Sequence, residues 1–246
     1  SQVTSTGSVA FGICARGTNQ HTVAIGSCAN ASGPGAVAVT GGYFGSSTVT
    51  AGGAVFGTGG LKSCGQHAFA FGSYSKASCN NSIAIGTTAL ADTKGKVAIA
   101  TDGFSAEYEL AGDAQRGLYI LKAATTDATV TALTANISTA AADNQFTLRN
   151  NSAYAFNGTI VGRESAANGT ESAAFKIEGL VRREANAGTT TLVNSAITVL
   201  SNADSWGGIA LVADTSNGAL KINVTGKSST SIRWVATIDT SEVIYA

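Results

Sequence analysis

The stretch SIAIGTTALADTKGKVAIA, residues 82–100, contains the same short apolar piece twice, fourteen residues apart. Related pieces recur through the first hundred residues, and their last positions are spaced by 14, 14, 17, 15, 14 and 14 residues. A period of fourteen is too short for a helical repeat but fits a strand, a turn, a second strand and a second turn. The pieces are SVAFG (8–12), TVAIG (22–26), AVAVT (36–40), GAVFG (53–57), AFAFG (68–72), SIAIG (82–86) and KVAIA (96–100).

Side chains alternate within each piece, and successive side chains of a strand point to opposite faces. One face carries large apolar residues such as Val23, Ile25, Ile83 and Ile85, whereas the other is almost entirely alanine. A water-facing position would vary among polar residues, so the alanine face indicates a second buried surface. Since a narrow roll has one interior, we expect other copies of the chain to cover the alanine face.

Tandem SVAIG-like units of this period resemble the head repeats of trimeric autotransporter adhesins of the YadA type, and similar rolls occur in bacteriophage tail fibres and spikes. The resemblance covers residues 8–103 and departs from the pattern at the insertion Gly41–Ser47 and at Ala100. It implies a left-handed parallel β-roll in which three chains pack around an axis. We therefore expect a β-roll domain at residues 1–103 in an intertwined homotrimer.

After residue 103 the period is lost. Residues 104–143 are expected to form a connector with short strands, because GLYILKAATTDATVTALT (117–134) is rich in β-branched residues. Longer alternating runs follow, with a hairpin turn expected at Asn217-Gly218 and Trp234 expected in the core. Residues 144–246 are thus predicted to be an antiparallel β-sandwich, which completes an all-β chain. The strand series of this half is FTLRNNSAYAF (146–156), AAFKIEGLVRREANAGTTTLV (173–193), ADTSNGALKINVTG (213–226) and SIRWVATIDTSEV (231–243). It resembles a C-terminal domain of phage tail fibres and related virion proteins, which implies trimeric virion architecture.

The composition argues against several partners. Fifteen basic and fifteen acidic residues cancel, and no basic cluster suggests binding to nucleic acid. No apolar run reaches the ~18 residues of a membrane span, so we expect no membrane insertion. The expected partners are other copies of the chain, other virion proteins and a host-surface glycan or envelope protein, and the expected location is the virion.

The sequence contains no recognisable catalytic motif, and the chain is expected not to be an enzyme. Its first 103 residues hold two acids, Asp92 and Asp102, and the acids Glu164, Glu171 and Asp214 are expected to be solvated loop charges. The histidines, His21 and His67, share one repeat position. A ring of imidazoles in a trimer would hold a metal, but a turn conformation is the favoured interpretation, so no metal or cofactor is expected.

Cysteines occur as two pairs at equivalent repeat positions, Cys14 with Cys28 and Cys64 with Cys79. Stacked strands would bring each pair to about 5 Å, within the range of disulfides. The alternative is a buried ladder of thiols that pack like alanine, which we favour because virion proteins assemble in a reducing cytoplasm.

Exposed aromatic residues are the candidate ligand contacts. Tyr43 and Phe44 lie on the insertion, where they either contact a ligand or cover a groove of a neighbouring chain, and Trp206 lies in the loop ADSWGG. The favoured function is non-enzymatic, multivalent attachment of a phage tail fibre or spike to its bacterial host. A structural spacer or head-decoration protein and a fragment of a bacterial trimeric adhesin are the alternatives, with a depolymerase last.

Overall fold

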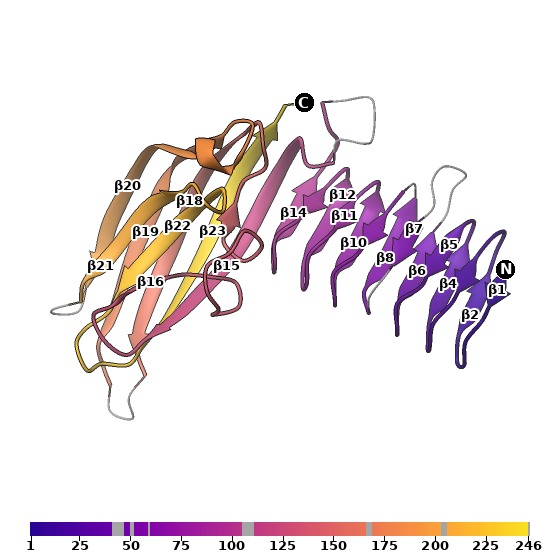
Figure 1. The fold of residues 1–246 in the computed structure, drawn as a ribbon, viewed down its shortest axis with the longest axis horizontal. Coiled ribbons are helices and arrows are strands. Elements are labelled where there is room, and N and C mark those ends of the chain that lie inside the picture. The colour runs from indigo at the N-terminus through magenta and orange to yellow at the C-terminus, as the bar shows by residue number, and fades with distance from the viewer. Residues whose placement is uncertain are drawn as a thin grey trace. The chain divides into compact units, whose positions relative to one another are not determined.

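The structure is a computed structural model that describes residues 1–40, 47–49, 52–58, 60–104, 111–165, 169–202 and 206–245. Within these residues the chain is all-β apart from one short 3-10 helix, η1 (Ala187–Thr189). It divides into two compact units, Ser1–Arg116 and Gly117–Ala246 (Figure 1). The sequence-based boundaries after residues 103 and 143 stay predictions. Within the described part of the chain, no helix has the length and apolarity to span a membrane.

The first unit is a parallel β-solenoid that contributes seven strands to each of two sheets (Figure 1). Consecutive strands alternate between the sheets, and each strand pairs in parallel with the strand two positions later. One sheet contains β1 (Gln2–Val3), β3 (Arg16–Gly17), β5 (Ala29–Ala31), β7 (Ser47–Val49), β9 (Lys62–Ser63), β11 (Lys76–Ala77) and β13 (Leu90–Ala91). The other contains β2 (Val9–Phe11), β4 (Val23–Gly26), β6 (Val37–Thr40), β8 (Ala54–Thr58), β10 (Phe69–Ser73), β12 (Ile83–Thr87) and β14 (Val97–Ala100).

The register of the second sheet matches the repeats of the sequence. Gly72 pairs with Gly57 on one side and with Gly86 on the other. The strands before and after the insertion, β6 and β8, also pair in this register, since Ala38 pairs with Val55. The seventeen-residue spacing therefore leaves the stacking of the strands intact.

The two faces of these strands are exchanged relative to the sequence-based prediction. The alanines, among them Ala24, Ala70 and Ala84, are fully buried inside the roll of this single chain. The large apolar side chains instead point outward, and Phe71 is 51% exposed. The reason is space, because short turns hold the two sheets so close together that mostly small side chains fit between them. The prediction that other copies cover the alanine face is wrong.

The glycine that ends most repeats is required by the stacking itself. Gly72 has a φ of 120°, and a Cβ placed on it would collide with the carbonyl oxygen of Gly86 in the next repeat. Glycine alone tolerates both conditions. Ala100 takes this position in the last repeat, which no further copy of the repeat follows.

Left-handed turns explain the histidines and two of the cysteines. His21 and His67 both have a φ of 55°, and Asn81 at the same repeat position has 58°. Cys14 and Cys28 have a φ of 56° at another turn. The four cysteines are thiols; three are exposed and Cys79 is half-buried, so the predicted buried ladder of thiols is wrong.

The last repeat is closed by a side chain. Gln115 is 8% exposed, and its amide pairs with the backbone of Leu90 in β13. Its Nε2 donates to the Leu90 carbonyl at 3.0 Å, and its Oε1 accepts from the Leu90 N–H at 2.8 Å. The side chain thereby supplies the two hydrogen bonds that a further strand would have made.

The second unit contains long antiparallel strands and a smaller sheet. The large sheet has the order β15-β23-β18-β19-β20, and in the small one β22 pairs with β16, β17 and β21. The strands are β15 (Ala114–Thr125), β16 (Val130–Ala132), β17 (Phe146–Thr147), β18 (Ser152–Glu164), β19 (Ser172–Arg183), β20 (Thr191–Ser201), β21 (Gly208–Asp214), β22 (Ala219–Thr225) and β23 (Ile232–Ile244).

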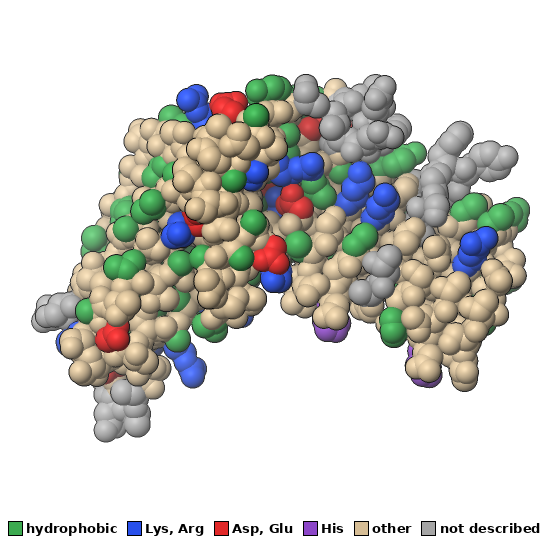
Figure 2. Space-filling view, in the orientation of Figure 1, with side chains coloured by type: hydrophobic (Ala, Val, Ile, Leu, Met, Phe, Trp, Pro, Cys, Tyr) green, Lys and Arg blue, Asp and Glu red, His purple; other side chains and the backbone are tan. Residues whose placement is uncertain are grey.

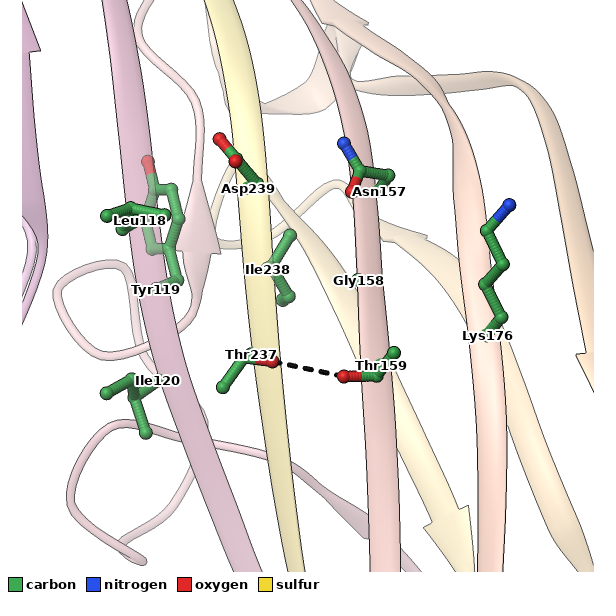
Figure 3. Close-up of a pocket in the computed structure, with 10 residues that line it drawn as sticks. All are labelled: Leu118, Tyr119, Ile120, Asn157, Gly158, Thr159, Lys176, Thr237, Ile238 and Asp239. Atoms are coloured by element: carbon green, nitrogen blue, oxygen red, sulfur yellow. Dashed lines mark hydrogen bonds between the residues drawn. The ribbon is translucent and has the colours of Figure 1, made fainter. Parts of the chain in front are cut away.

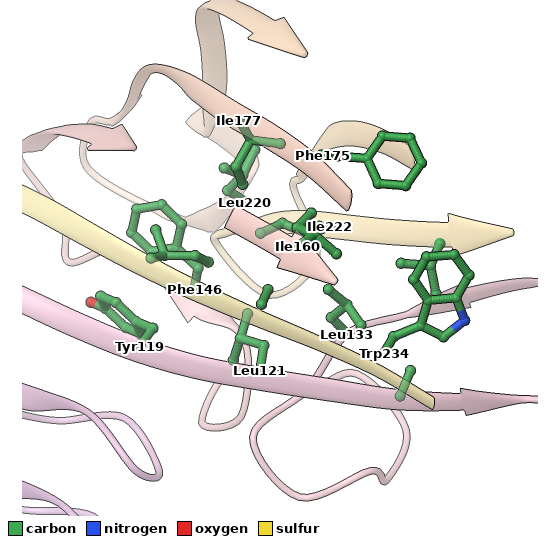
Figure 4. Close-up of a cluster of buried hydrophobic side chains, with 14 of the residues drawn as sticks. Tyr119, Leu121, Leu133, Phe146, Ile160, Phe175, Ile177, Leu220, Ile222 and Trp234 are labelled. Carbon is green, nitrogen blue, oxygen red and sulfur yellow. The ribbon is translucent and has the colours of Figure 1, made fainter. Parts of the chain in front are cut away.

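Large side chains from both sheets form one hydrophobic core in this unit (Figure 4). Phe146 lies at its centre, with ring centroids 4.9 Å from Tyr119 and 5.8 Å from Phe156. Trp234 is fully buried, as predicted, and its indole N–H donates to Thr125 Oγ1 at 3.0 Å. Both aromatic packing and a satisfied indole N–H are typical of a stable core.

The turn at Asn217-Gly218 belongs to a longer loop than expected. Asp214 pairs with Ala219 across the β21–β22 hairpin, and Gly218 has a φ of 68°. Asp214 is 5% exposed and accepts hydrogen bonds from the backbone N–H groups of Ser216 and Asn217, both at 3.2 Å. Asp214 is therefore a buried structural residue, and its assignment as a solvated loop charge is wrong.

Candidate functional site

The aromatic residues proposed from the sequence do not form a common site in the described structure. Tyr43 and Phe44 fall within residues 41–46, which lie outside the described residues. Trp206 is 5% exposed, and its ring lies 5.2 Å from that of Trp234. Its indole N–H donates to Glu171 Oε2 at 3.0 Å. A contact between Trp206 and a ligand stays a prediction, as it does for the other two residues.

Glu171 is a half-buried acid that stabilises this corner of the second unit. Lys227 Nζ lies 3.1 Å from Glu171 Oε1, in an ion pair. Hydrogen bonds from Trp206 and then Lys227 lower the pKa of Glu171. This acid is therefore committed to the Trp206 loop, and it is not the solvated charge that the sequence suggested.

A different place in the second unit has the form of a binding site. An open pocket of about 480 Å³ lies on the large sheet, on the face that points away from the hydrophobic core (Figure 3). Its volume falls within the usual range of small-molecule sites. Four adjacent strands line it: Leu118, Tyr119 and Ile120 from β15, Thr237, Ile238 and Asp239 from β23, Asn157, Gly158 and Thr159 from β18, and Lys176 from β19.

Strand alternation explains why polar groups gather there. On β23 and β18, every second side chain packs into the core, and those between them face outward. The register then places Asp239 opposite Asn157 and Thr237 opposite Thr159. The two threonine hydroxyls are 3.2 Å apart, within hydrogen-bonding distance, so a small polar pair forms part of the pocket floor (Figure 3).

The pocket has an apolar side and a polar side. Ile120 on β15 is 61% exposed, and Leu118 lies beside it on the same strand (Figure 3). Asp239, Asn157 and Lys176 supply a carboxylate, an amide and an ammonium group. Lys176 Nζ is 2.7 Å from Glu178 Oε2, and both side chains are about half exposed. The arrangement suits a ligand that has many hydroxyl groups and an apolar ring face.

Two carboxylates lie on strands that flank the same asparagine. Asn157 is opposite Asp239 on β23 and opposite Glu178 on β19. Two strand spacings place the backbones of these acids about 10 Å apart. Inverting glycosidases hold their carboxyl groups about 6.5 to 9.5 Å apart, so the side chains need to lean only slightly toward each other to reach that range.

Sequence reasoning missed this pocket because its residues come from four strands that are far apart in the chain. The alternation in each strand was visible, and it placed Asp239 with Thr237 and Asn157 with Thr159 on shared faces. The pairing of β18 with both β19 and β23 was not visible. Without the order of the strands, the sequence had no signal that brings these side chains together.

Comparison with known proteins gives matches in structure only. No protein-family model matches the chain, and no curated protein matches it. The tailspike protein of Acinetobacter baumannii bacteriophage Fri1, described as a capsular polysaccharide depolymerase, aligns over 93% of this chain and 40% of its own, with 10% identity and a TM-score of 0.31. The Acinetobacter baumannii phage AM24 tailspike protein aligns over 93% of this chain and 50% of its own, with 9% identity and a TM-score of 0.27. The chain thus spans half or less of the length of these tailspikes.

The comparison corrects one expectation. The chain was expected not to be an enzyme because its sequence has no catalytic motif. A tailspike to which the chain is similar is described as a capsular polysaccharide depolymerase. The missing motif therefore does not exclude catalysis, and the non-enzymatic assignment is withdrawn.

Proposed function

We propose that the chain is part of a bacteriophage tail appendage, of the tailspike or tail-fibre type, that binds a polysaccharide on the host surface. The pocket on the outer face of the large sheet is the proposed binding site. The resemblance of the repeats and of the C-terminal strands to virion proteins supports the class of protein. The second unit is then a β-sandwich whose outer face carries the ligand.

The observation that carries the binding proposal is the combination of groups in the pocket. Asp239 and Asn157 can accept and donate hydrogen bonds to sugar hydroxyls, and the Thr237–Thr159 pair adds two more hydroxyls. Leu118 and Ile120 provide an apolar surface for the C–H face of a sugar ring. Saccharide sites need both kinds of group, because a sugar ring has polar edges and an apolar face.

Trimer formation is the second part of the proposal, and it rests on the outward face of the β-solenoid. Large apolar side chains repeat there in register from strand to strand, including Phe71, Ile85 and Ile99, which are 51%, 37% and 36% exposed. Figure 2 shows hydrophobic side chains at the surface of this unit. A continuous exposed apolar surface marks an interface. Copies of the chain would bury this face, and three saccharide sites would bind with avidity.

Sedimentation tests the trimer. The wild-type protein is expected to have the mass of three chains, and Phe71→Glu with Ile85→Glu is expected to lower it toward one. Ser78→Glu, which adds a negative charge at an exposed turn, is the matched control and should not change the mass. A wild-type mass of one chain would contradict the trimer without affecting the pocket.

Binding to purified capsular polysaccharides tests the pocket. The double variant Asp239→Asn and Asn157→Ala is expected to bind at least tenfold more weakly, because loss of two hydrogen bonds costs about 1 to 3 kcal/mol. Ser241→Ala, on the same strand and the same exposed face but outside the pocket, is the control. Equal binding by the wild type, the double variant and Ser241→Ala would show that the polysaccharide binds outside this pocket. Tyr43, Phe44 and Trp206 would then be the next residues to change. Absence of binding by the wild type would favour a structural spacer or an adhesin fragment.

Cleavage of the bound polysaccharide is a second candidate function, and the placement of Asp239 and Glu178 on either side of Asn157 favours it. An inverting reaction needs one acid to protonate the leaving oxygen and one base to activate water. Release of reducing ends by the wild type, lost in Asp239→Asn and in Glu178→Gln, would establish it. Binding without release of reducing ends would leave attachment as the function.

A further inference from the structure

Two arginines lie opposite each other on the same outer face as the pocket. Arg163 on β18 pairs with Arg233 on β23, and both side chains are exposed. Like charges directly opposite each other in a sheet are destabilising. An anion bound beside these two side chains would offset their repulsion.

The Arg163 guanidinium is already oriented by the protein. Its Nη1 donates to the Thr170 carbonyl at 2.6 Å, and its Nη2 donates to the Gly169 carbonyl at 2.9 Å. These two bonds fix the planar group while leaving other N–H groups available, since a guanidinium has five. A guanidinium whose orientation is already fixed loses less entropy when it binds a carboxylate.

Neither arginine has an ion-pair partner among the residues that the structure describes. Two other exposed basic residues of the same sheet, Lys176 and Arg182, differ in this respect. Lys176 pairs with Glu178 at 2.7 Å, and Arg182 Nε lies 3.8 Å from Glu184 Oε1. The positive charge is thus neutralised around Lys176 and Arg182 but not at Arg163 and Arg233, nor at Lys122 on the neighbouring strand β15.

The arginine pair and the pocket lie at two places along the outer faces of the same two strands, β18 and β23. Arg233 and Asp239 are six positions apart on β23, which corresponds to about 20 Å along the strand. Between them lie Val235 and Val161, which are 45% and 50% exposed, and then the Thr237–Thr159 pair. Apolar and hydroxyl groups therefore alternate along the path that a chain of several sugar residues would follow.

We propose that Arg163 and Arg233 form an anion subsite that binds the carboxylate of an acidic polysaccharide whose chain extends to the Asp239 pocket. The inference rests on the proposed polysaccharide-binding function and specifies the ligand as an acidic polymer, such as one that contains uronic acid. Charge-assisted bidentate hydrogen bonds from two guanidinium groups are the strongest way for side chains to recognise a carboxylate.

The direct test is an NMR titration of the arginine Nε–Hε signals with sodium D-glucuronate, with D-glucose as the neutral probe. We expect saturable shifts at Arg163 and Arg233 with glucuronate, none with glucose, and none at Arg182. Arg233→Gln should reduce the shift at Arg163, whereas Arg182→Gln, which removes the same charge from the same face, should not. Shifts at Arg182 as large as those at Arg163 and Arg233, or no shifts at all, would overturn the subsite.

A polysaccharide panel separates this inference from the proposed function. Acidic bacterial polysaccharides are compared with their carboxyl-reduced forms, and we expect Arg233→Gln and carboxyl reduction each to weaken binding about tenfold or more, without adding to one another. Binding that is unaffected by Arg233→Gln and by carboxyl reduction, but is lost in the variant Asp239→Asn with Asn157→Ala, would refute the acidic ligand and keep the proposed function. Binding to no polymer, with the glucuronate shifts intact, would refute the proposed function and keep the anion subsite.

Discussion

The two units of the chain bury side chains of opposite size. The interior of the β-solenoid is filled mainly by alanine, with Ala24, Ala70 and Ala84 fully buried, and most of its large apolar residues face outward. The second unit buries tryptophan, tyrosine and phenylalanine between its two sheets. Paired sheets of ordinary spacing are about 10 Å apart and need large side chains to fill the gap. The solenoid depends instead on backbone hydrogen bonds between closely stacked strands, so each unit is sensitive to a different kind of change.

Removal of a large side chain should affect the second unit most. Trp234→Ala is expected to lower the free energy of unfolding by about 3 to 5 kcal/mol, because Trp234 is fully buried and the cavity would be large. It would also leave the Thr125 hydroxyl without its indole partner. Denaturant unfolding monitored by circular dichroism measures the loss. Trp234→Phe should cost less, and a loss below about 1 kcal/mol for the alanine variant would contradict the importance of volume in this core.

Addition of a single methyl group should affect the solenoid. Gly72→Ala is expected to destabilise it by up to about 3 kcal/mol, because the new Cβ meets the Gly86 carbonyl oxygen and the backbone has a positive φ. Gly35→Ala is the control, since Gly35 also has a positive φ, 66°, but an added Cβ meets nothing within 4 Å. It isolates the strain of the backbone. Equal losses of melting temperature in the two variants would show that close stacking contributes nothing.

The two units also differ in how much of their structure could be predicted from the sequence. Repeat spacing alone gave the strands of the solenoid and their register, because each strand pairs with its own copy in the next repeat. It did not show which face is inside, since that depends on the separation of the sheets. Lys96 illustrates the limit: it occupies the interior position of Ser82 one repeat later, is fully buried, and lies 3.6 Å from Asp92. In the second unit the strands were visible but their order was not, so the pocket and the arginine pair were out of reach.

Loss of the closing side chain should have a smaller and more local effect on the solenoid. Gln115→Leu is expected to cost about 2 kcal/mol, because it leaves the N–H and the C=O of Leu90 without the partners that Gln115 supplies. Amide hydrogen exchange measures this local loss of stability. We expect exchange to become faster at Leu90 and to change little at strands farther from this end, such as β4. Gln115→Glu retains an acceptor for the Leu90 N–H but buries a carboxylate against the Leu90 carbonyl oxygen, so it should cost at least as much as Gln115→Leu. Uniform acceleration of exchange along the whole solenoid would mean that the repeats unfold together and that Gln115 has no special role at the end.

The smallest expected effect is a dependence of the second unit on acid. Burial acts to raise the pKa of Asp214, but hydrogen bonds from Asn217, Gln145 and Lys221 outweigh it and lower the pKa below the usual range of an aspartate. A lowered pKa in the folded state means that stability is complete above the unfolded pKa, near 4, and declines as the pH falls from there toward the folded value. We expect a loss of about 1 kcal/mol between pH 5 and pH 2.5 that is absent in Asp214→Asn, measured as the difference between the two unfolding curves. The difference isolates Asp214 from the other carboxylates that titrate in the same range. If the stability of the wild type and of Asp214→Asn changed with pH in the same way, the charge of Asp214 would contribute nothing. A neutral side chain would then hold the hairpin as well as the carboxylate does.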